Sequence, residues 1–313
     1  MRLYGKSELK NRLDGIAEQG RLPHAVLFSG HSGGGKKALA KYTAQLFLCE
    51  NGACGACPVC RNIENGIHPD VIFVKEQCGG KYAAAPFREV LSGTAIRPNN
   101  GDFKVYVFED CDTMRTEHHN ALLKLIEEPA EYLRFVFTCE NTSVVPETVL
   151  SRVTEFAVPD TPVEDCKQAL IDGGVEAKKA QELAEMFAGN IGKCKAVLDG
   201  GDEAQLIEAA RKTAAALGAR DGFGLAAALS EKSNRAEFGQ VVEYLSRIVR
   251  DALAVKCGEQ AEFFGKAESK KIAENFSEDE ILNILDTVFE LAKNEVYNIN
   301  LPLTAAYFVS RVL

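Results

Sequence analysis

Long apolar runs are missing from this sequence: nowhere do about 18 apolar residues follow one another, the length that a helix needs to cross a bilayer. The first residues, Met1 to Lys6, turn polar at once and lack the apolar segment of a secretory signal. Low-complexity tracts and internal repeats are also absent. These absences argue against a membrane-spanning or secreted protein, and the cytoplasm is the expected location.

An excess of positive charge is also missing. The chain has 36 Lys and Arg residues against 45 Asp and Glu residues, a net charge of −9. Broad autonomous binding to DNA is therefore not expected, because phosphate contacts need clustered Lys and Arg. A local basic rim, or a place in a complex whose other members hold DNA, remains compatible with this charge. At 313 residues the chain is long enough for two or three domains.

The first half alternates short apolar runs with helix-like segments, which is typical of a parallel α/β sheet. A parallel sheet is buried on both faces, so its strands read as continuous apolar runs. Helices are predicted over residues 36–48 and 117–128, the second burying Ala121, Leu122 and Leu125 against the sheet. The predicted strands are residues 25–28, 71–74, 105–108 and 135–138.

From about residue 160 onward the pattern is helical. Thr161 begins a capping-box pattern with proline at the next position, and Ser277 begins another. Apolar residues at three- and four-residue spacing over 238–253 predict one buried stripe. The acidic, glycine-containing stretch 199–203 is interpreted as a linker. These signals predict three domains, over residues 1–160, 161–202 and 203–313.

Residues 30–37, Gly-His-Ser-Gly-Gly-Gly-Lys-Lys, follow a predicted strand and open a predicted helix, as a P-loop does. In such a loop backbone N–H groups cradle phosphate oxygens and the lysine, here Lys36, reaches the terminal phosphates. The next position should be Ser or Thr to hold Mg²⁺, but Lys37 cannot ligate a cation. A glycine-rich turn that merely caps a helix is the alternative. The candidate nucleotide-binding residues are Gly30, Gly33, Gly34, Gly35 and Lys36.

Glu109 and Asp110 follow the predicted strand that ends at Phe108. In P-loop ATPases an acidic residue at this place helps to hold Mg²⁺, and its neighbour polarises the attacking water. Both residues are therefore added to a degenerate nucleotide site. The bland alternative is two solvated acids at a strand end.

Four cysteines, Cys49, Cys54, Cys57 and Cys60, fall within the segment 49–60. Four thiolates at this spacing suit a closed, structural tetrahedral Zn²⁺ site. An iron–sulfur cluster and coincidental core cysteines are the alternatives. His68 is interpreted as part of a turn and not as a further ligand. The remaining cysteines are interpreted as small core residues: Cys78, Cys111, Cys139, Cys166, Cys194 and Cys257.

Several motifs together resemble the clamp-loader branch of AAA+ proteins. Residues 120–129, Asn-Ala-Leu-Leu-Lys-Leu-Ile-Glu-Glu-Pro, closely match a hallmark of that family. Residues 23–30 match its approach to the P-loop, and Ser151-Arg152-Val153 resembles its S-R-C motif, with valine in place of cysteine. A four-cysteine zinc module after the P-loop helix is characteristic of bacterial members, although the first spacing here is shorter. The resemblance covers about residues 1–195. It implies an AAA+ nucleotide-binding-type domain, a helical lid and a helical collar.

Within that family, five differences separate this chain from the gamma/tau ATPase. They are Lys37 after the loop lysine, the reversed order Glu109-Asp110, and Gly192 where the lid motif carries arginine. The others are the triplet at 68–70 and a sequence that stops short of the long tau extension. The resemblance therefore implies a stator type of subunit without intrinsic ATPase, which binds ATP or ADP weakly or not at all.

The resemblance also implies that Arg152 supplies an arginine finger to the ATP site of a neighbouring subunit. Such a finger accelerates phosphoryl transfer by ~10³–10⁵. The implied partners are the gamma/tau and delta subunits of a DNA polymerase III clamp loader, with the sliding clamp and primed DNA reached through the complex. From its position alone, Arg152 could also be a surface arginine just past a strand. A gamma/tau-type ATPase and a zinc-ribbon nucleic-acid-binding protein with a decayed P-loop remain alternative functions.

Overall fold

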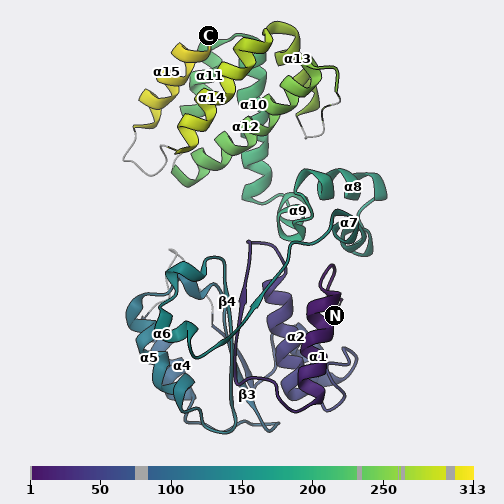
Figure 1. The fold of residues 1–313 in the computed structure, drawn as a ribbon, viewed down its shortest axis with the longest axis vertical. Helices are drawn as coiled ribbons and strands as arrows, with labels where there is room; N and C mark the ends of the chain where they lie inside the picture. Colours follow the sequence, from purple (N-terminus) through teal and green to yellow (C-terminus); the bar gives the residue numbers. More distant parts are fainter. Residues whose placement is uncertain (1, 75–83, 231–234, 260, 262–264, 294–299) are drawn as a thin grey trace. The chain divides into compact units, whose positions relative to one another are not determined.

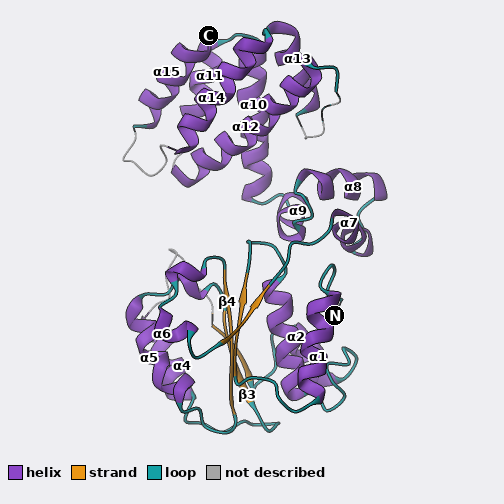
Figure 2. Cartoon of the chain, viewed as in Figure 1, coloured by secondary structure: helices purple, strands orange, loops and turns teal. Residues whose placement is uncertain are grey.

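The computed structural model describes residues 2–74, 84–230, 235–259, 261, 265–293 and 300–313. The chain divides into two compact units, residues 1–169 with 189–192, and residues 170–188 with 193–313. Figure 1 follows the chain through both units, and Figure 2 distinguishes the strands of the first unit from the helices. The three-domain division at residues 160 and 202 stays a prediction.

Unit 1 is built on a five-stranded parallel sheet in the order β2-β3-β4-β1-β5. The four predicted strands are confirmed. Their apolar runs form strands because both faces of the sheet are covered. The sequence does not predict β5, an edge strand in which Phe156 alone is buried. The strands are β1 (Ala25–Ser29), β2 (Val71–Val74), β3 (Lys104–Phe108), β4 (Leu133–Cys139) and β5 (Thr154–Ala157).

Helices cover both faces of this sheet, with α1 and α2 on one side and α4, α5 and α6 on the other (Figure 1). The core has two apolar layers. One layer contains stacked rings, with the centroids of Phe108 and Phe137 5.1 Å apart. The other holds Val26, Phe28 and Leu39. The helices of unit 1 are α1 (Ser7–Glu18), α2 (Lys36–Leu48), α3 (Pro58–Glu64), α4 (Ala84–Gly93), α5 (Thr116–Glu127) and α6 (Glu147–Leu150).

The predicted helix over residues 117–128 is α5, but its buried face differs in part from the prediction. Leu122 is buried and Leu125 is half-buried, as expected. Ala121 is exposed, so its predicted burial is wrong; Ile126 is the second buried apolar residue of this helix. Leu122 and Ile126 are four positions apart and so lie on the same face of the helix.

Helix α7 (Val163–Asp172) begins in unit 1 and ends in unit 2, which is otherwise all helical where the structure describes it. Helix α12 packs against α10, α13 and α14. Its predicted apolar stripe is confirmed at Phe238, Val241, Val242, Leu245, Ile248, Val249 and Ala252, all of which are buried, and its last residue, Leu253, is half-buried. The other helices are α8 (Ala177–Met186), α9 (Ile191–Leu198), α10 (Asp202–Gly218), α11 (Gly222–Ser230), α12 (Arg235–Lys256), α13 (Lys266–Asn275), α14 (Glu278–Lys293) and α15 (Leu301–Val312).

The predicted helix start at Ser277 is confirmed, and the predicted linker at 199–203 is corrected. The backbone N–H of Ser277 donates to Glu280 Oε2 at 2.7 Å, and the N–H of Glu280 donates to Ser277 Oγ at 3.3 Å. This is the reciprocal capping box that the sequence predicts. The predicted linker at 199–203 is too long, because Asp202 and Glu203 form the first turn of α10. Acidic residues there favour the positive end of the helix dipole.

The scattered cysteines follow the prediction with one exception. Four of them are buried: Cys111, Cys139, Cys166 and Cys194. Cys257 is exposed at the end of α12, so its assignment to the core is wrong, and Cys78 lies outside the described residues. Among the described helices, none combines the length and apolar character that crossing a bilayer requires.

Candidate functional site

The glycine-rich loop lies between β1 and α2, the strand–loop–helix arrangement that the sequence predicts. Gly33 and Gly35 have φ of 73° and 94°, in the left-handed region that favours glycine. A side chain at Gly34 would place its Cβ 3.0 Å from the carbonyl oxygen of His31. The loop thus needs glycine for conformation and for close approach, and it leads directly into the N-terminus of α2.

Lys36 is folded back onto this loop. Its Nζ donates to the carbonyl oxygens of Gly30 at 2.6 Å and His31 at 2.9 Å. The residue is 4% exposed, and burial lowers the pKa of its ammonium group, opposed by the nearby acids Glu140 and Asp110. Carbonyl oxygens of the loop therefore accept hydrogen bonds from two of the N–H donors of Lys36. A phosphate bound to this loop would compete with these carbonyls for the same donors.

Lys37 contacts both acids at the end of β3. Its Nζ lies 3.0 Å from Glu109 Oε2 and 3.2 Å from Asp110 Oδ2. Burial lowers the pKa of Lys37, but its hydrogen bonds to these acids and their charges outweigh burial and raise it. Glu109 is 5% exposed, so the interpretation of this pair as two solvated acids is wrong for Glu109.

The donor set around this loop does not fit Mg²⁺. A P-loop magnesium is held by a hydroxyl after the loop lysine and by an acidic group at the strand end. Here the hydroxyl is replaced by the ammonium of Lys37, which has no lone pair and already pairs with both acids. No chemical step through magnesium follows from this arrangement.

The segment 189–192 closes on the loop within unit 1, a contact that the sequence does not reveal. The N–H of Gly192 donates to the carbonyl oxygen of Gly33 at 3.2 Å, and Asn190 Nδ2 donates to that of Ser32 at 2.6 Å. A Cβ at Gly192 would lie 2.5 Å from the Cα of Gly33. Since that neighbour is backbone, no arginine could stand at position 192 without moving the loop.

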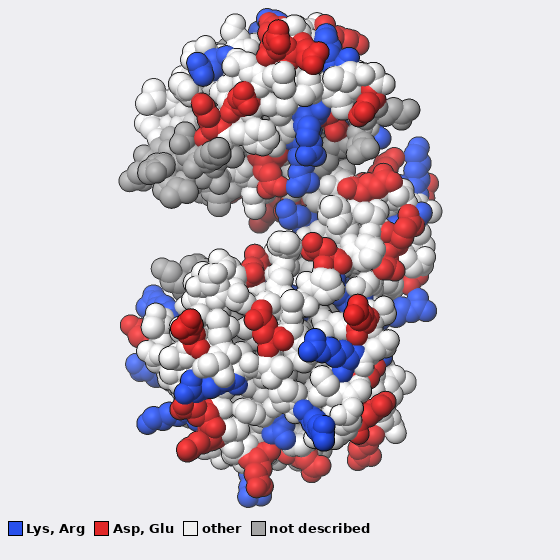
Figure 3. Space-filling model, viewed as in Figure 1, with Lys and Arg blue, Asp and Glu red and all other residues white. Residues whose placement is uncertain are grey.

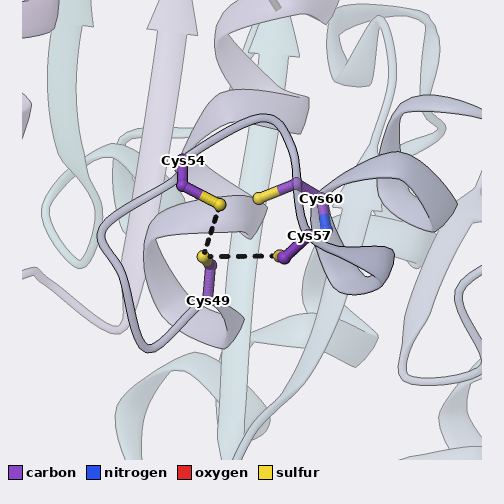
Figure 4. Close-up of side chains that lie close together, drawn as sticks. All are labelled: Cys49, Cys54, Cys57 and Cys60. Carbon is purple, nitrogen blue, oxygen red and sulfur yellow. Dashed lines mark hydrogen bonds between the residues drawn. The ribbon is translucent and has the colours of Figure 1, made fainter.

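The four clustered cysteines come together around the turn between α2 and α3 (Figure 4). Their sulfur atoms all lie within 4.8 Å of one another. The Sγ atom of Cys49 lies 3.7 Å from those of Cys54 and Cys57. A tetrahedron with four Zn–S bonds of ~2.3 Å has edges of ~3.8 Å. Both the spacing and the all-thiol donor set fit a zinc ion, which Cys49, Cys54, Cys57 and Cys60 would hold.

Backbone geometry in this turn serves the cluster. Gly52, Ala53 and Gly55 all have positive φ, which turns the chain back on itself between the first and third cysteine. Hydrogen bonds from the N–H groups of Ala56 and Cys57 lower the pKa of the exposed Cys54 thiol to about 6, whereas burial raises the pKa of Cys60. A metal ion would hold all four as thiolates.

His68 does not join this cluster. Its ring Nδ1 accepts the N–H of Asp70 at 3.2 Å, directly before β2, so the predicted turn is confirmed. Asp70 is fully buried and accepts from the N–H groups of Asn99 and Asn100 at 2.6 and 2.8 Å. The segment His68-Pro69-Asp70 therefore anchors a neighbouring loop and does not bind metal with the cysteines.

Arg152 follows α6 and precedes β5. The alternative interpretation from the sequence, an arginine just past a strand, is therefore wrong. Its Nε donates to Glu127 Oε1 at 2.7 Å, and its Nη1 donates to the carbonyl oxygen of Thr148 at 2.8 Å and to Ser151 Oγ at 3.1 Å. The side chain is 35% exposed. Glu127, from the 120–129 motif, is a partner that the sequence does not single out.

The surface of unit 1 carries both signs of charge. On the face drawn in Figure 3, Lys and Arg side chains of the lower unit are interspersed with Asp and Glu. This face offers no broad basic field of the kind that autonomous DNA binding needs.

The sheet, the glycine-rich loop after β1 and the segment that closes on it form a parallel α/β unit with the strand–loop–helix arrangement of a P-loop. A DNA polymerase III gamma subunit-related protein from Thermotoga maritima has a similar fold, with a TM-score of 0.54 at 15% identity over 97% of this chain and 99% of that one. The family model described as "DNA polymerase III, delta subunit" matches residues 5–162, about half of the chain. The chain belongs to this DNA polymerase III family.

Curated relatives are similar over the same region. The chain is 32% identical over 172 residues to the DNA polymerase III subunit tau of Escherichia coli, covering 54% of this chain and 26% of that protein. It is 29% identical over 158 residues to subunit tau of Bacillus subtilis, covering 49% and 28%. The similarity thus spans about a quarter of the length of these relatives.

Proposed function

We propose that this chain is the delta prime subunit, the stator, of a DNA polymerase III clamp loader. In that function it would join gamma/tau and delta subunits in a ring that loads the sliding clamp onto primed DNA. Family membership supports the general function, and the geometry of the loop supports the particular subunit. Zinc, held by the four cysteines, would serve structure alone because four thiolates leave no open position for water.

The observation that carries the proposal is the pair of ion pairs made by Lys37. An active ATPase needs a metal ion near Glu109 and Asp110, but an ammonium group lies 3.0 and 3.2 Å from their oxygens. The contact between Gly192 and Gly33 is a second departure, because it leaves no space for a lid arginine. We therefore expect negligible hydrolysis by the isolated chain.

Arg152 is proposed to work on the ATP of a neighbouring subunit. Its guanidinium is partly exposed and bound by one carboxylate and two neutral acceptors. A half-exposed ion pair contributes about 0–1 kcal/mol, so a phosphate group with several negative charges can compete for the guanidinium. This arrangement is compatible with a finger that rests on Glu127 until a partner presents its nucleotide.

The gamma/tau ATPase is the second candidate, favoured by the names of the curated relatives, tau in Escherichia coli and in Bacillus subtilis. DNA-stimulated ATP hydrolysis by the isolated chain would favour that candidate. A zinc-ribbon nucleic-acid-binding protein is the third, and its net charge of −9 weakens it. Salt-sensitive DNA binding by the isolated chain would support the third candidate.

The test is reconstitution of the full chain with gamma and delta subunits, followed by sizing of the complex and measurement of ATP hydrolysis. Arg152→Ala should leave assembly intact and abolish turnover at the interface that the finger serves, a loss of ~10³-fold or more at that site. Arg97→Ala, another exposed arginine of unit 1, is the matched control and should behave as wild type. Unchanged hydrolysis with Arg152→Ala would remove the finger, and rapid hydrolysis by the chain alone would remove the stator assignment.

A further inference from the structure

Glu109 and Asp110 both pair with Lys37. Lys37 stands in the first turn of α2, one residue after the loop lysine, and its Nζ reaches Glu109 Oε2 at 3.0 Å and Asp110 Oδ2 at 3.2 Å. Glu109 is 5% exposed, and a buried carboxylate needs a partner of opposite charge. Lys37 supplies that charge.

This ammonium group and a divalent ion compete for the same position. Mg²⁺ takes oxygen ligands at ~2.0–2.1 Å in octahedral geometry, and the two acidic oxygens it would need already face Lys37. Repulsion adds to this steric conflict. With the ammonium group and Mg²⁺ about 4 Å apart in water, the repulsion between one and two positive charges weakens metal binding by roughly 30-fold.

The chemistry of lysine suits the substitution. An ammonium group has three N–H donors and no acceptor. Among the described residues two carboxylates take two of these donors, which leaves one for a phosphate oxygen. Lys36, the preceding residue, is bonded to the loop carbonyls of Gly30 and His31. The loop thus has two cationic side chains where a P-loop ATPase has one and a metal ion.

We propose that Lys37 is a built-in substitute for the divalent cation. Its ammonium group neutralises Glu109 and Asp110 and excludes Mg²⁺, and a nucleoside di- or triphosphate bound to this loop is held without metal. This inference starts from the same two ion pairs as the proposed function, but it does not need a place in a clamp loader. It is tested by metal binding to the chain alone, whereas the proposed function is tested by assembly and hydrolysis with partner subunits.

The test uses the full chain and Mn²⁺, a paramagnetic substitute for Mg²⁺, titrated with and without ADP and followed by electron paramagnetic resonance. Lys37→Ser restores the hydroxyl that a P-loop has at this place. We expect Lys37→Ser to gain one Mn²⁺ site at least roughly 30-fold tighter than any site of the wild type that depends on Glu109. The double variant Lys37→Ser/Glu109→Gln should lose that site. Lys41→Ser, the same change one turn further along α2, should bind Mn²⁺ as the wild type does.

Stability provides a second measurement, because Lys37→Ser removes a positive charge from beside a buried glutamate. If Lys37→Ser does not fold in sodium chloride, addition of Mg²⁺ should restore folding, whereas sodium chloride at equal ionic strength should not. Two results would overturn the proposal. One is a Lys37→Ser variant that neither binds Mn²⁺ more tightly than wild type nor regains stability with Mg²⁺. The other is a wild-type Mn²⁺ site that disappears in Glu109→Gln and is as tight as the site of Lys37→Ser.

Discussion

Replacing Cys57 with serine removes one of the four sulfur atoms that converge between α2 and α3. Its Sγ lies 3.7 Å from that of Cys49, and all four sulfurs lie within 4.8 Å. With only three thiolates left, the closed four-sulfur shell of a structural zinc site is lost. The turn that the cluster holds connects directly to buried positions, because Gln45 Nε2 donates to the carbonyl oxygen of Cys60 at 3.1 Å. We therefore expect a loss of stability in unit 1.

The size of the loss follows from metal linkage. A ligand that binds only the folded chain and is present at about 1,000 times its dissociation constant stabilises the fold by about 4 kcal/mol. For a unit of this size each kcal/mol moves the melting temperature by about 2–4 °C. Cys57→Ser, or a strong chelator acting on the wild type, should therefore lower the unfolding midpoint of unit 1 by roughly 8–16 °C.

The assay combines metal analysis with thermal unfolding. Wild type should contain about one zinc per chain, and Cys57→Ser should contain much less and be insensitive to chelator. Cys257→Ser is the matched control, since that cysteine is exposed in unit 2. Iron with visible absorbance would identify an iron–sulfur cluster instead. A folded, metal-free wild type whose midpoint does not respond to chelator would refute the four-thiolate interpretation.

Two further predictions concern the loop and the pH dependence of unit 2. Gly33→Ala should lower the free energy of unfolding in urea by at least about 1 kcal/mol more than Gly20→Ala does. Both glycines have positive φ, but a Cβ at Gly33 would lie 2.1 Å from Asn190 Oδ1, whereas a Cβ at Gly20 would meet open space. Equal losses would contradict the contact. The N–H of Ser277, together with Arg220, lowers the pKa of Glu280 to about 2 from its usual 4.5. A lowered folded-state pKa stabilises above the unfolded pKa, so the destabilisation by Glu280→Gln should be full at pH 6 and shrink as the pH falls from 4.5 toward 2. A pH-independent effect would count against this linkage.

Strands and long helices could be predicted from sequence because their signals are local. The apolar run at Val71–Val74 forms a strand with the predicted bounds, and the helix at Lys36–Leu48 likewise begins and ends as expected. The glycine-rich loop and the cysteine spacing could be found for the same reason, since each motif lies within about a dozen residues. β5 could not, because its exposed Thr and Glu give neither an apolar run nor alternation, and only pairing with β1 makes it a strand.

Contacts between distant residues account for most of what the sequence could not reveal. Lys37 and Glu109 are far apart in the chain, and only the parallel order of β1, β4 and β3 brings the loop to the end of β3. Arg152 and Glu127 meet for a similar reason, because α5 and α6 lie on the same face of the sheet. Neither pair has a characteristic sequence spacing. Ala121 shows a related limit: helical periodicity alone did not decide which side of α5 faces the sheet.

Two departures from an ATPase site act independently on the same loop, and together they make a simple reversal improbable. Lys37→Ser would free Glu109 and Asp110 for a metal ion. It would not move Gly192, where any Cβ would lie 2.5 Å from the backbone of Gly33 and exclude an arginine. Hence Lys37→Ser should regain divalent binding without regaining hydrolysis. That combination follows from the geometry because the first defect is electrostatic and belongs to one side chain, whereas the second is steric and belongs to the backbone.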